Sequence, residues 1–378
     1  MSDHGDSPGH TFPTDRSRND RPDSFPHEIG YDGHRDHFQP EPPQSFPGGT
    51  IINAQNVNHR YGETGIHILH RAVALEALYD SAESFPQPRC HPETRTEILD
   101  DLYNWAVGDS TYLIRWLHGP AGAGKSAIMQ TLCQRLKEAG RLGGAFFFKR
   151  GHATRGNAKV LFATLAYQLA LHHRKLNAPI SRSAETDPSV VGRGMDVQLY
   201  SLIVEPCKLL RDPAPLILLI DGLDECEGLN VQQEILRLIA FIAHNRSLRL
   251  KFLIASRPEA HIREEFEEDS FQELYDSVNV EQSFDDIRKY LRDEFTRIHR
   301  EHQHTMGNIP TPWPSTETLN HLVRKSSGYF IYASTIIRFI DDKGFRPTKR
   351  LESIQNLSSG DSDSPFAALD QLYLQILS

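Results

Sequence analysis

Residues 119–126 read Gly-Pro-Ala-Gly-Ala-Gly-Lys-Ser and match the phosphate-binding pattern G-x-x-x-x-G-K-[ST] in full. Glycines let backbone N–H groups turn toward phosphate oxygens, and a following helix adds the positive end of its dipole. Lys125 is expected to reach the β- and γ-phosphates, and the Ser126 hydroxyl to bind Mg²⁺. A glycine-rich turn that only caps a helix is the alternative. The predicted phosphate-binding residues are Gly119, Pro120, Ala121, Gly122, Ala123, Gly124, Lys125, Ser126 and Ala127.

Three carboxylates follow the aliphatic run 216–220 within five residues. Such a run is typical of a central parallel strand covered on both faces, and open α/β sheets bind ligands at the carboxyl ends of their strands. Asp221 is therefore the candidate Mg²⁺ ligand. Asp224 and Glu225 are candidates for polarising or positioning an attacking water. A strand that ends in a solvated acidic turn is the alternative.

An arginine follows another aliphatic run, in the segment 252–258 (Phe-Leu-Ile-Ala-Ser-Arg-Pro). If this strand neighbours the strand before the phosphate loop, Arg257 would sense the γ-phosphate or stabilise developing negative charge. An arginine before proline at a strand end also occurs in ordinary surface ion pairs, so that alternative stays open.

The elements that must position these residues alternate between strand-like and helix-like patterns. The strand-like runs lie at 112–117, 145–148, 216–220 and 252–255. This alternation predicts a parallel sheet covered by helices, and thus an α/β fold. Behind the phosphate loop, the apolar spacing of Ile128, Leu132 and Leu136 predicts a helix that ends at Gly140.

Helical patterns flank this core on both sides. Upstream, an apolar stripe runs from Ile66 to about Tyr79, and Thr94–Glu97 predicts a capping box that opens a helix through Trp105. Downstream of residue 280 no strand pattern recurs, and two helical faces are predicted. They consist of Ile287, Tyr290, Leu291 and Phe295, and of Tyr329, Phe330, Ala333, Ile336, Ile337 and Ile340.

The two ends of the chain differ from this body. Residues 1–50 hold eight of the 23 prolines and, beyond Met1, one aliphatic side chain, so a disordered tail is expected. The final stretch, 369–377, is amphipathic and has no stop signal. An apolar face that ends with the chain suggests that a longer protein continues beyond Ser378.

Composition limits the partners. The chain has 41 basic and 50 acidic side chains, and residues 1–50 account for four and nine of them. Because the remaining body has no basic stripe suited to a phosphate backbone, nucleic acid is an unexpected partner. Four scattered cysteines suggest a reducing compartment, and neither a membrane span nor a signal peptide is predicted. A cytoplasmic location is expected.

With these motifs together, the sequence resembles the NACHT-domain NTPases, signal-transduction P-loop NTPases related to NOD-like immune receptors, and most closely their many fungal members. The resemblance rests on the loop 119–126, on Leu-Leu-Ile-Asp-Gly-Leu-Asp-Glu-Cys at 218–226, and on Ala-Ser-Arg-Pro-Glu at 255–259. Flanking segments at 79–83, 90–95 and 327–334 also match, so the resemblance covers about residues 50–378.

The resemblance implies a five-stranded parallel core in which the sensor strand separates the Walker-B strand from the Walker-A strand. It implies four parts: a tail at 1–50, a helical lead-in at 51–108, the NTPase core at 109–280, and an incomplete helical subdomain at 281–378. Members bind ATP or GTP with Mg²⁺, hydrolyse it slowly, and self-associate through the NACHT core to recruit an effector protein. The implied function is a nucleotide-dependent switch in immunity-like or incompatibility signalling.

Carried over residue by residue, the resemblance gives the phosphate loop its ligand role and makes Asp221 the Mg²⁺ ligand through water. Asp224 or Glu225 then serves hydrolysis, and Arg257 is the first sensor. Two departures are expected: Gly328-Tyr329-Phe330 stands in the place of a Gly-x-Pro motif, and the printed sequence stops before the family's winged-helix domain and repeats would begin.

Other readings stay open. Arg95 is expected either to contact nucleotide, as an upstream basic residue does in relatives, or to be a helix-surface charge. The chain as a whole is an NTPase or a nucleotide-binding interaction scaffold without turnover. A small-molecule kinase is disfavoured because no arginine-rich insertion lies between Asp221 and Arg257.

Overall fold

The computed structural model describes residues 63–210, 214–356, 370 and 373–374. The tail predicted at 1–50 lies outside these residues, as does nearly all of the amphipathic stretch predicted at 369–377. In the described part no helix is both long and apolar enough to cross a membrane. All four cysteines are free thiols.

A five-stranded parallel sheet forms the centre of the core, which confirms the predicted α/β class. Its strands are β1 Ile114–His118, β2 Leu142–Phe147, β3 Leu216–Asp221, β4 Leu250–Ser256 and β5 Tyr275–Asn279, in the order β2-β3-β4-β1-β5. The four predicted apolar runs supply the first four strands. The order also confirms that the strand leading to Arg257 separates the acidic strand from the strand before the phosphate loop.

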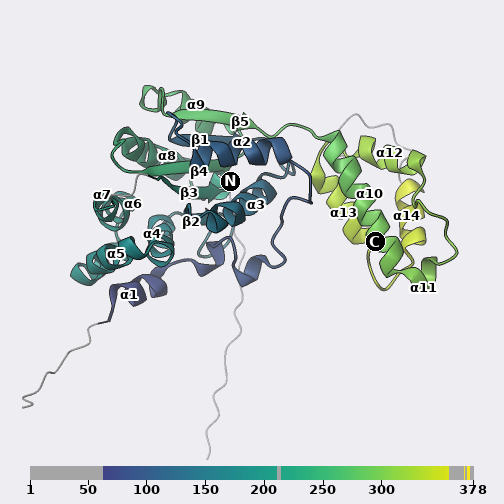
Figure 1. Ribbon diagram of the computed structural model, residues 1–378, viewed down its shortest axis with the longest axis horizontal. Coiled ribbons are helices and arrows are strands. Elements are labelled where there is room, and N and C mark those ends of the chain that lie inside the picture. Colours follow the sequence, from purple (N-terminus) through teal and green to yellow (C-terminus); the bar gives the residue numbers. More distant parts are fainter. Residues whose placement is uncertain (1–62, 211–213, 357–369, 371–372, 375–378) are drawn as a thin grey trace, which may run out of the picture. The chain divides into compact units, whose positions relative to one another are not determined.

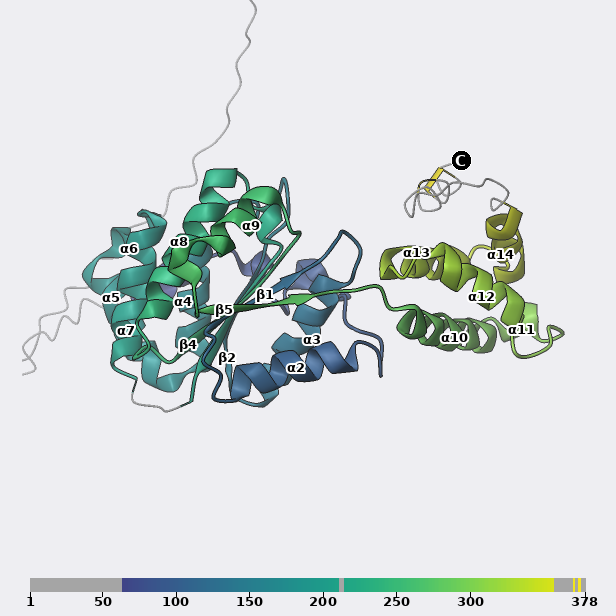
Figure 2. The same ribbon diagram turned by 90° about the horizontal axis from the view of Figure 1, so that it is seen from above.

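Helices cover both faces of the sheet (Figures 1 and 2). One face packs on α2 Thr96–Val107 and α3 Lys125–Glu138. The other packs on α4 Leu161–His172, α8 Leu229–His244 and α9 Ala260–Glu267, and α1 Gly65–Ala72 and α5 Arg174–Thr186 pack on the outer side of α4. Alternate residues of each strand enter the two layers: Leu117 and Leu219 belong to one core, and Trp116 and Leu218 to the other.

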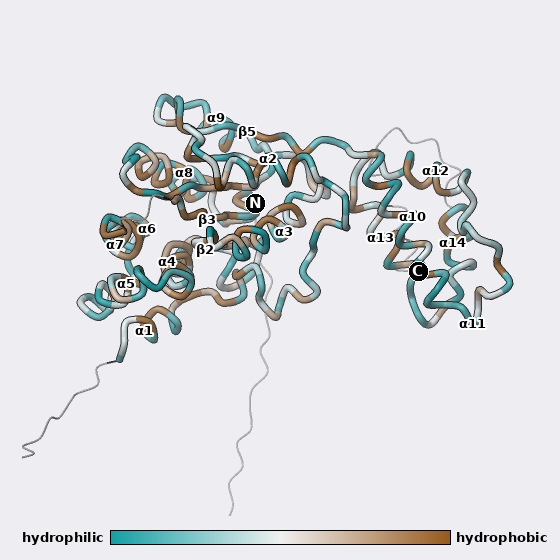
Figure 3. The backbone as a smooth tube through the Cα atoms, viewed as in Figure 1, coloured by the Kyte–Doolittle hydropathy of each residue, from teal (hydrophilic) through white to brown (hydrophobic). Residues whose placement is uncertain are grey.

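Strand β3 and helix α4 are mostly apolar because they are covered on nearly all sides. Every residue of β3 is buried, as are nine of the twelve residues of α4. In Figure 3, β3 has hydrophobic colouring, whereas the surface helices are more hydrophilic. This burial fixes where β3 ends, and therefore where its terminal carboxylate lies.

Short elements complete the core. Between β2 and β3 the chain forms η3 Pro188–Gly192, α6 Met195–Leu199, the π-helical turn η4 Tyr200–Val204 and α7 Glu205–Lys208. Single 3₁₀ turns occur at η1 Leu75–Ala77, η2 Ala82–Ser84, η5 Leu223–Glu225 and η6 Asp269–Phe271.

The lead-in corrects two predictions. The apolar stripe predicted to run to Tyr79 as a helix is helical only to Ala72, after which 3₁₀ turns take over. The predicted capping box is wrong: the N-cap of α2 is Arg95, with a left-handed φ of 55° and no side-chain cap. The hydroxyl of Thr94 instead donates to the His91 carbonyl at 2.7 Å.

A separate helical region follows the sheet. It comprises α10 Phe284–Glu301, α11 Gln303–Met306, α12 Thr316–Lys325, α13 Phe330–Ile340 and α14 Pro347–Asn356. These helices share their own apolar core, to which α10 contributes Ile287, Leu291 and Phe295. The helical face predicted on α10 is thus confirmed, as is that on α13 except at Tyr329, which precedes the helix and packs against the core of the sheet.

Candidate functional site

The phosphate loop connects β1 to α3, as its motif requires (Figure 1). Gly122 and Gly124 have left-handed φ values of 73° and 97°, and Gly124 is the N-cap of α3. A side chain at either position would strain the backbone. At Gly122 it would also collide with a neighbour, since a Cβ would lie 2.4 Å from Cγ2 of Ile331. The loop therefore depends on its glycines.

Lys125 bends back over the loop that precedes it. Its Nζ donates to the carbonyl of Gly119 at 2.7 Å and to that of Pro120 at 3.0 Å. Burial lowers the pKa of Lys125, and the carboxylates of Asp224 and Asp221 act in the opposite direction. A poorly hydrated ammonium group held by two carbonyl oxygens can exchange these acceptors for stronger anionic ones.

Asp221 ends β3 inside the site and is only 5% exposed. The Ser126 side chain acts on its carboxyl group, lowering its pKa, and Oδ1 is buried with no hydrogen-bond partner among the described residues. Burial raises the pKa of Asp221 to about 7, although Ser126 and Lys125 oppose the shift. An orphaned buried acceptor requires an explanation such as an ion.

The residues present fit Mg²⁺. A carboxylate and a hydroxyl lie together beside the phosphate loop, and Mg²⁺ prefers oxygen ligands, commonly one or two carboxylates together with phosphates. The free Oδ1 of Asp221 is the position where such an ion, or water bound to it, would satisfy a buried acceptor.

Asp224 and Glu225 separate into different surroundings in η5. Asp224 is held by Arg257: its Oδ1 accepts the Arg257 backbone N–H at 2.9 Å, and its Oδ2 lies 3.3 Å from the Arg257 Nε. Glu225 is half-buried, and its Oε2 accepts the backbone N–H of Arg150 at 3.2 Å. Of the two candidates for positioning water, Glu225 is the one that no side-chain cation holds by an ion pair among the described residues.

Two further residues of this edge escaped the sequence prediction. Arg150, in the turn after β2, donates from its guanidinium to the Asp224 carbonyl at 3.0 Å. His118 ends β1 directly before the loop, and burial, aided by Lys125, lowers its pKa. Both lie at the carboxyl ends of parallel strands, and that position was the signal available for finding them.

Arg95 links the phosphate loop to the helical region. Its guanidinium donates to the carbonyls of Ala123 at 3.1 Å and Glu281 at 2.9 Å, and its backbone N–H donates to Asp286 in α10 at 3.1 Å. Arg95 is 7% exposed, so the alternative of a helix-surface charge is wrong.

The segment that stands in place of Gly-x-Pro also meets the loop. Phe330 opens α13, and the next backbone N–H, that of Ile331, donates to the Gly122 carbonyl at 3.3 Å. The ring of Phe330 lies 5.4 Å from the Arg95 guanidinium. The phosphate loop is therefore contacted by both the lead-in and the helical region.

This strand order, with a phosphate loop between β1 and α3 and a carboxylate at the end of β3, defines a P-loop NTPase fold. A family model described as Nephrocystin 3, N-terminal, matches residues 93–257, which is less than half of the chain. That stretch runs from the approach to α2 through the loop and the acidic strand end to Arg257. No curated protein matches the chain.

Solved structures give distant matches. Drosophila ORC bound to DNA is 11% identical, with 70% of this chain and 67% of that chain covered and a TM-score of 0.45. Cdc6p from Pyrobaculum aerophilum is 15% identical, with 76% and 73% covered and a TM-score of 0.44. AMPPCP-bound DnaA from Aquifex aeolicus is 12% identical, with 73% and 74% covered and a TM-score of 0.39.

Proposed function

We propose that this chain is a Mg²⁺-dependent ATP- or GTP-binding NTPase that acts as a switch for self-association in NACHT-type signalling in the cytoplasm. The observation that carries the proposal is the meeting of Lys125, Ser126 and Asp221 beside the phosphate loop, with Asp221 Oδ1 left without a partner in the described part of the chain. The core at 109–280 would bind nucleotide, and the helices from 281 onward would respond to it.

Lys125 and the loop would bind the phosphates. Lys125 would exchange the carbonyls of Gly119 and Pro120 for phosphate oxygens, and the N–H groups at the start of α3 would add further donors. Mg²⁺, when bound, supplies positive charge against the phosphate oxygens. Asp221 and Ser126 would hold it, and the buried Asp221 carboxyl would then carry its negative charge without an uncompensated desolvation cost.

Glu225 and Arg257 would serve hydrolysis. Glu225 would orient water through a carboxylate that is half-buried and hydrogen-bonded to the backbone of Arg150. Asp224 would position Arg257, whose side chain is 44% exposed and therefore available to a phosphate.

The contacts of Arg95 and Ile331 with the loop support the switching part of the proposal. Both residues bind loop carbonyls, those of Ala123 and Gly122. A change in loop conformation on nucleotide binding would alter these hydrogen bonds and so would act on the helical region.

The test is equilibrium binding of fluorescent ATP and GTP, with and without Mg²⁺, to wild type and Lys125→Ala. We expect the variant to lose at least about a hundredfold in affinity, because charge-assisted hydrogen bonds to phosphate are lost. Lys175→Ala, which removes an exposed lysine of α5, is the matched control. Unchanged binding by Lys125→Ala would reject the proposal.

A further inference from the structure

The outer side of α9 and η6 is strongly acidic. Residues 260–271 contain five carboxylates and a single basic residue, Arg263. Glu265 is buried and paired with Arg237 of α8, with both carboxylate oxygens within 2.9 Å of guanidinium nitrogens. The other four are exposed and have no ion pair among the described residues. This acidic face comprises Glu264, Glu267, Glu268 and Asp269.

A groove with an exposed aromatic ring borders the acidic face. It encloses about 450 Å³ between α8 and the α9–η6 segment, and its lining residues are Arg237, Phe241, His244, Glu265, Glu268 and Ser270. Phe241 is 72% exposed. Aromatic rings beside a groove are typical anchors of protein interfaces, and an arginine can stack on such a ring. The surface therefore suits a partner that presents arginines.

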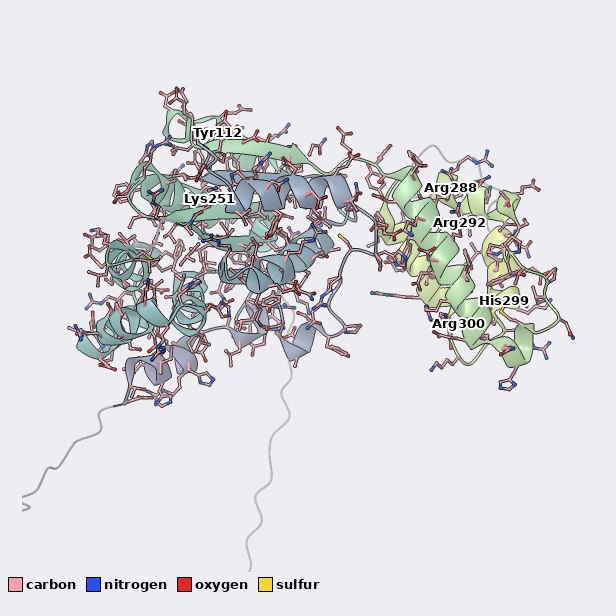
Figure 4. The ribbon with its side chains drawn as sticks, in the orientation of Figure 1. Tyr112, Lys251, Arg288, Arg292, His299 and Arg300 are labelled. Carbon is pink, nitrogen blue, oxygen red and sulfur yellow. The ribbon has the colours of Figure 1, made fainter. Side chains whose placement is uncertain are left out.

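Helix α10 carries the complementary surface. Arg288, Arg292, Thr296 and Arg300 follow one another in steps of four and so lie along one side of the helix, where Figure 4 labels the three arginines. Arg292 and Arg300 are exposed, and neither has an ion pair within the described part of the chain. We call these three arginines the arginine stripe.

The opposite flank of α10 shows that its unpaired charges are not a general property of the helix. There Lys289 pairs with Glu93 and Asp293, and Arg297 pairs with three carboxylates, those of Glu294, Glu301 and Asp341. The cations of that flank are paired within the chain, whereas the arginine stripe has only Asp285, which pairs with Arg288.

We propose that the arginine stripe of one copy of this chain docks on the acidic face and Phe241 of a second copy. The inference rests on the proposed function, in which self-association is the output. A second copy is favoured over a polyanion because the chain is net acidic, with a formal charge of −9, and itself carries the matching carboxylates. Guanidinium groups pair with carboxylates in a bidentate manner and stack on aromatic rings, so one stripe serves both features of the face.

The stripe and the acidic face lie on different elements of the chain. Used toward two different neighbours, they build a closed ring or an open filament, and used reciprocally between two copies, they build a two-fold dimer. Association of this kind weakens as salt rises because exposed charges are screened.

The test is sedimentation velocity of the full chain over a concentration series up to about 100 μM, at about 50 and 500 mM salt, with and without Mg·ATP. We expect association at low salt, and a loss of at least about tenfold in affinity for Arg292→Glu with Arg300→Glu. Glu264→Lys with Glu268→Lys should lose as much. A chain with all four substitutions should associate again, as should a mixture of the two double variants.

A matched control is Lys175→Glu with Arg182→Glu, which changes the net charge equally on exposed residues of α5. The inference is overturned if wild type stays monomeric under all conditions, if the control weakens association as much as the stripe variant, or if the charge swap restores nothing. It is also overturned if heparin binds the stripe and no self-association occurs.

Nucleotide binding measured on the same samples separates the two proposals. Variants that bind nucleotide like wild type, yet are not restored by the charge swap, reject only the docking surface. Restored association in a chain that binds no nucleotide rejects the proposed function and leaves the docking surface intact.

Discussion

Two lysines, one near the amino end of a strand and one beyond the carboxyl end of another, donate hydrogen bonds to main-chain carbonyls. Only Lys125 is placed to bind a ligand. Lys251 (Figure 4), near the start of β4, is 3% exposed and donates to the carbonyls of Trp105 at 2.6 Å and Gly108 at 2.7 Å. Burial lowers its pKa, as it does that of Lys125. Lys125 donates to two loop carbonyls at similar distances.

The difference lies in what could replace each lysine. The acceptors of Lys251 are the carbonyls of Trp105, in the last turn of α2, and of Gly108, the residue that follows the helix, where carbonyls lack a partner within the helix. The Lys251 Nζ also lies 5.5 Å from the centre of the Trp105 ring. Lys125 is half-buried and stands beside the orphaned carboxyl oxygen of Asp221. Similar hydrogen bonds thus serve two purposes. Those of Lys251 cap the C-terminus of α2, whereas those of Lys125 hold an ammonium group that can bind phosphate oxygens instead.

The largest difference is expected in stability. Lys251→Met should lower the free energy of unfolding by about 3 kcal/mol, because buried carbonyls are left without donors. Lys125→Met should cost no more than about 1 kcal/mol, since water can reach the loop carbonyls. Urea unfolding of the nucleotide-free chain measures both.

Lys175→Met, an exposed substitution on α5, supplies the baseline for this pair. Equal losses at Lys125 and Lys251 would remove the distinction between a ligand-binding and a structural lysine. Folded Lys251→Met should still bind nucleotide with wild-type affinity, which would separate its role from that of Lys125.

A smaller and opposite effect is expected at Asp221. Asp221→Asn should stabilise the nucleotide-free chain by about 2 kcal/mol, because it removes a buried carboxyl whose charged form the fold disfavours. The same variant should lose the Mg²⁺ dependence of nucleotide binding. Thermal unfolding and Mg²⁺ titration of the same sample test the two halves.

The stabilisation should depend on pH in a defined direction. The pKa of Asp221 is about 7 in the folded chain and 3.8 as its ordinary value, so the folded state binds the proton more tightly. Wild type therefore loses stability as pH rises from about 4 to about 7, and Asp221→Asn does not share this loss. The difference between the two should be near zero at the acid end. A difference that shrinks toward pH 7 would contradict the assignment.

The smallest effect is expected at Glu225. Glu225→Gln should slow single-turnover hydrolysis about tenfold while nucleotide affinity stays nearly constant, because the side chain would orient water and not phosphate. Equal rates in variant and wild type would favour a nucleotide-binding scaffold. Glu227→Gln, two residues away and exposed, is the control.

Strands could be predicted from the sequence where the local apolar pattern agrees with burial in the folded chain. The aliphatic runs that became β3 and β4 are buried on both faces, so composition alone identified them. It was insufficient for β5, an edge strand whose residues are partly buried or exposed and give no apolar run. The start of β2 was missed as well, because Gly143 and Gly144 lack the strand signature. At these two positions a Cβ atom would lie 3.1 Å from side-chain atoms of Leu169 and Gln168, so glycine lets α4 approach the strand closely.

The capping box failed for a related reason. Thr94 and Glu97 have the right spacing, but Arg95 takes the left-handed N-cap position while its N–H donates to Asp286, almost two hundred residues away in the chain. A local motif was overridden by a tertiary hydrogen bond that no sequence window contains.

The amino-acid sequence was enough to predict the phosphate loop and the acidic strand end, because glycine geometry, helix dipoles and apolar burial act over a few residues. Which carboxylate remains free was visible only in the folded chain. It paired Asp224 with Arg257 and left Oδ1 of Asp221 without a partner in the described chain. The physical reason is that pairing and desolvation depend on which strand ends are neighbours, and the order of strands in the sheet sets that.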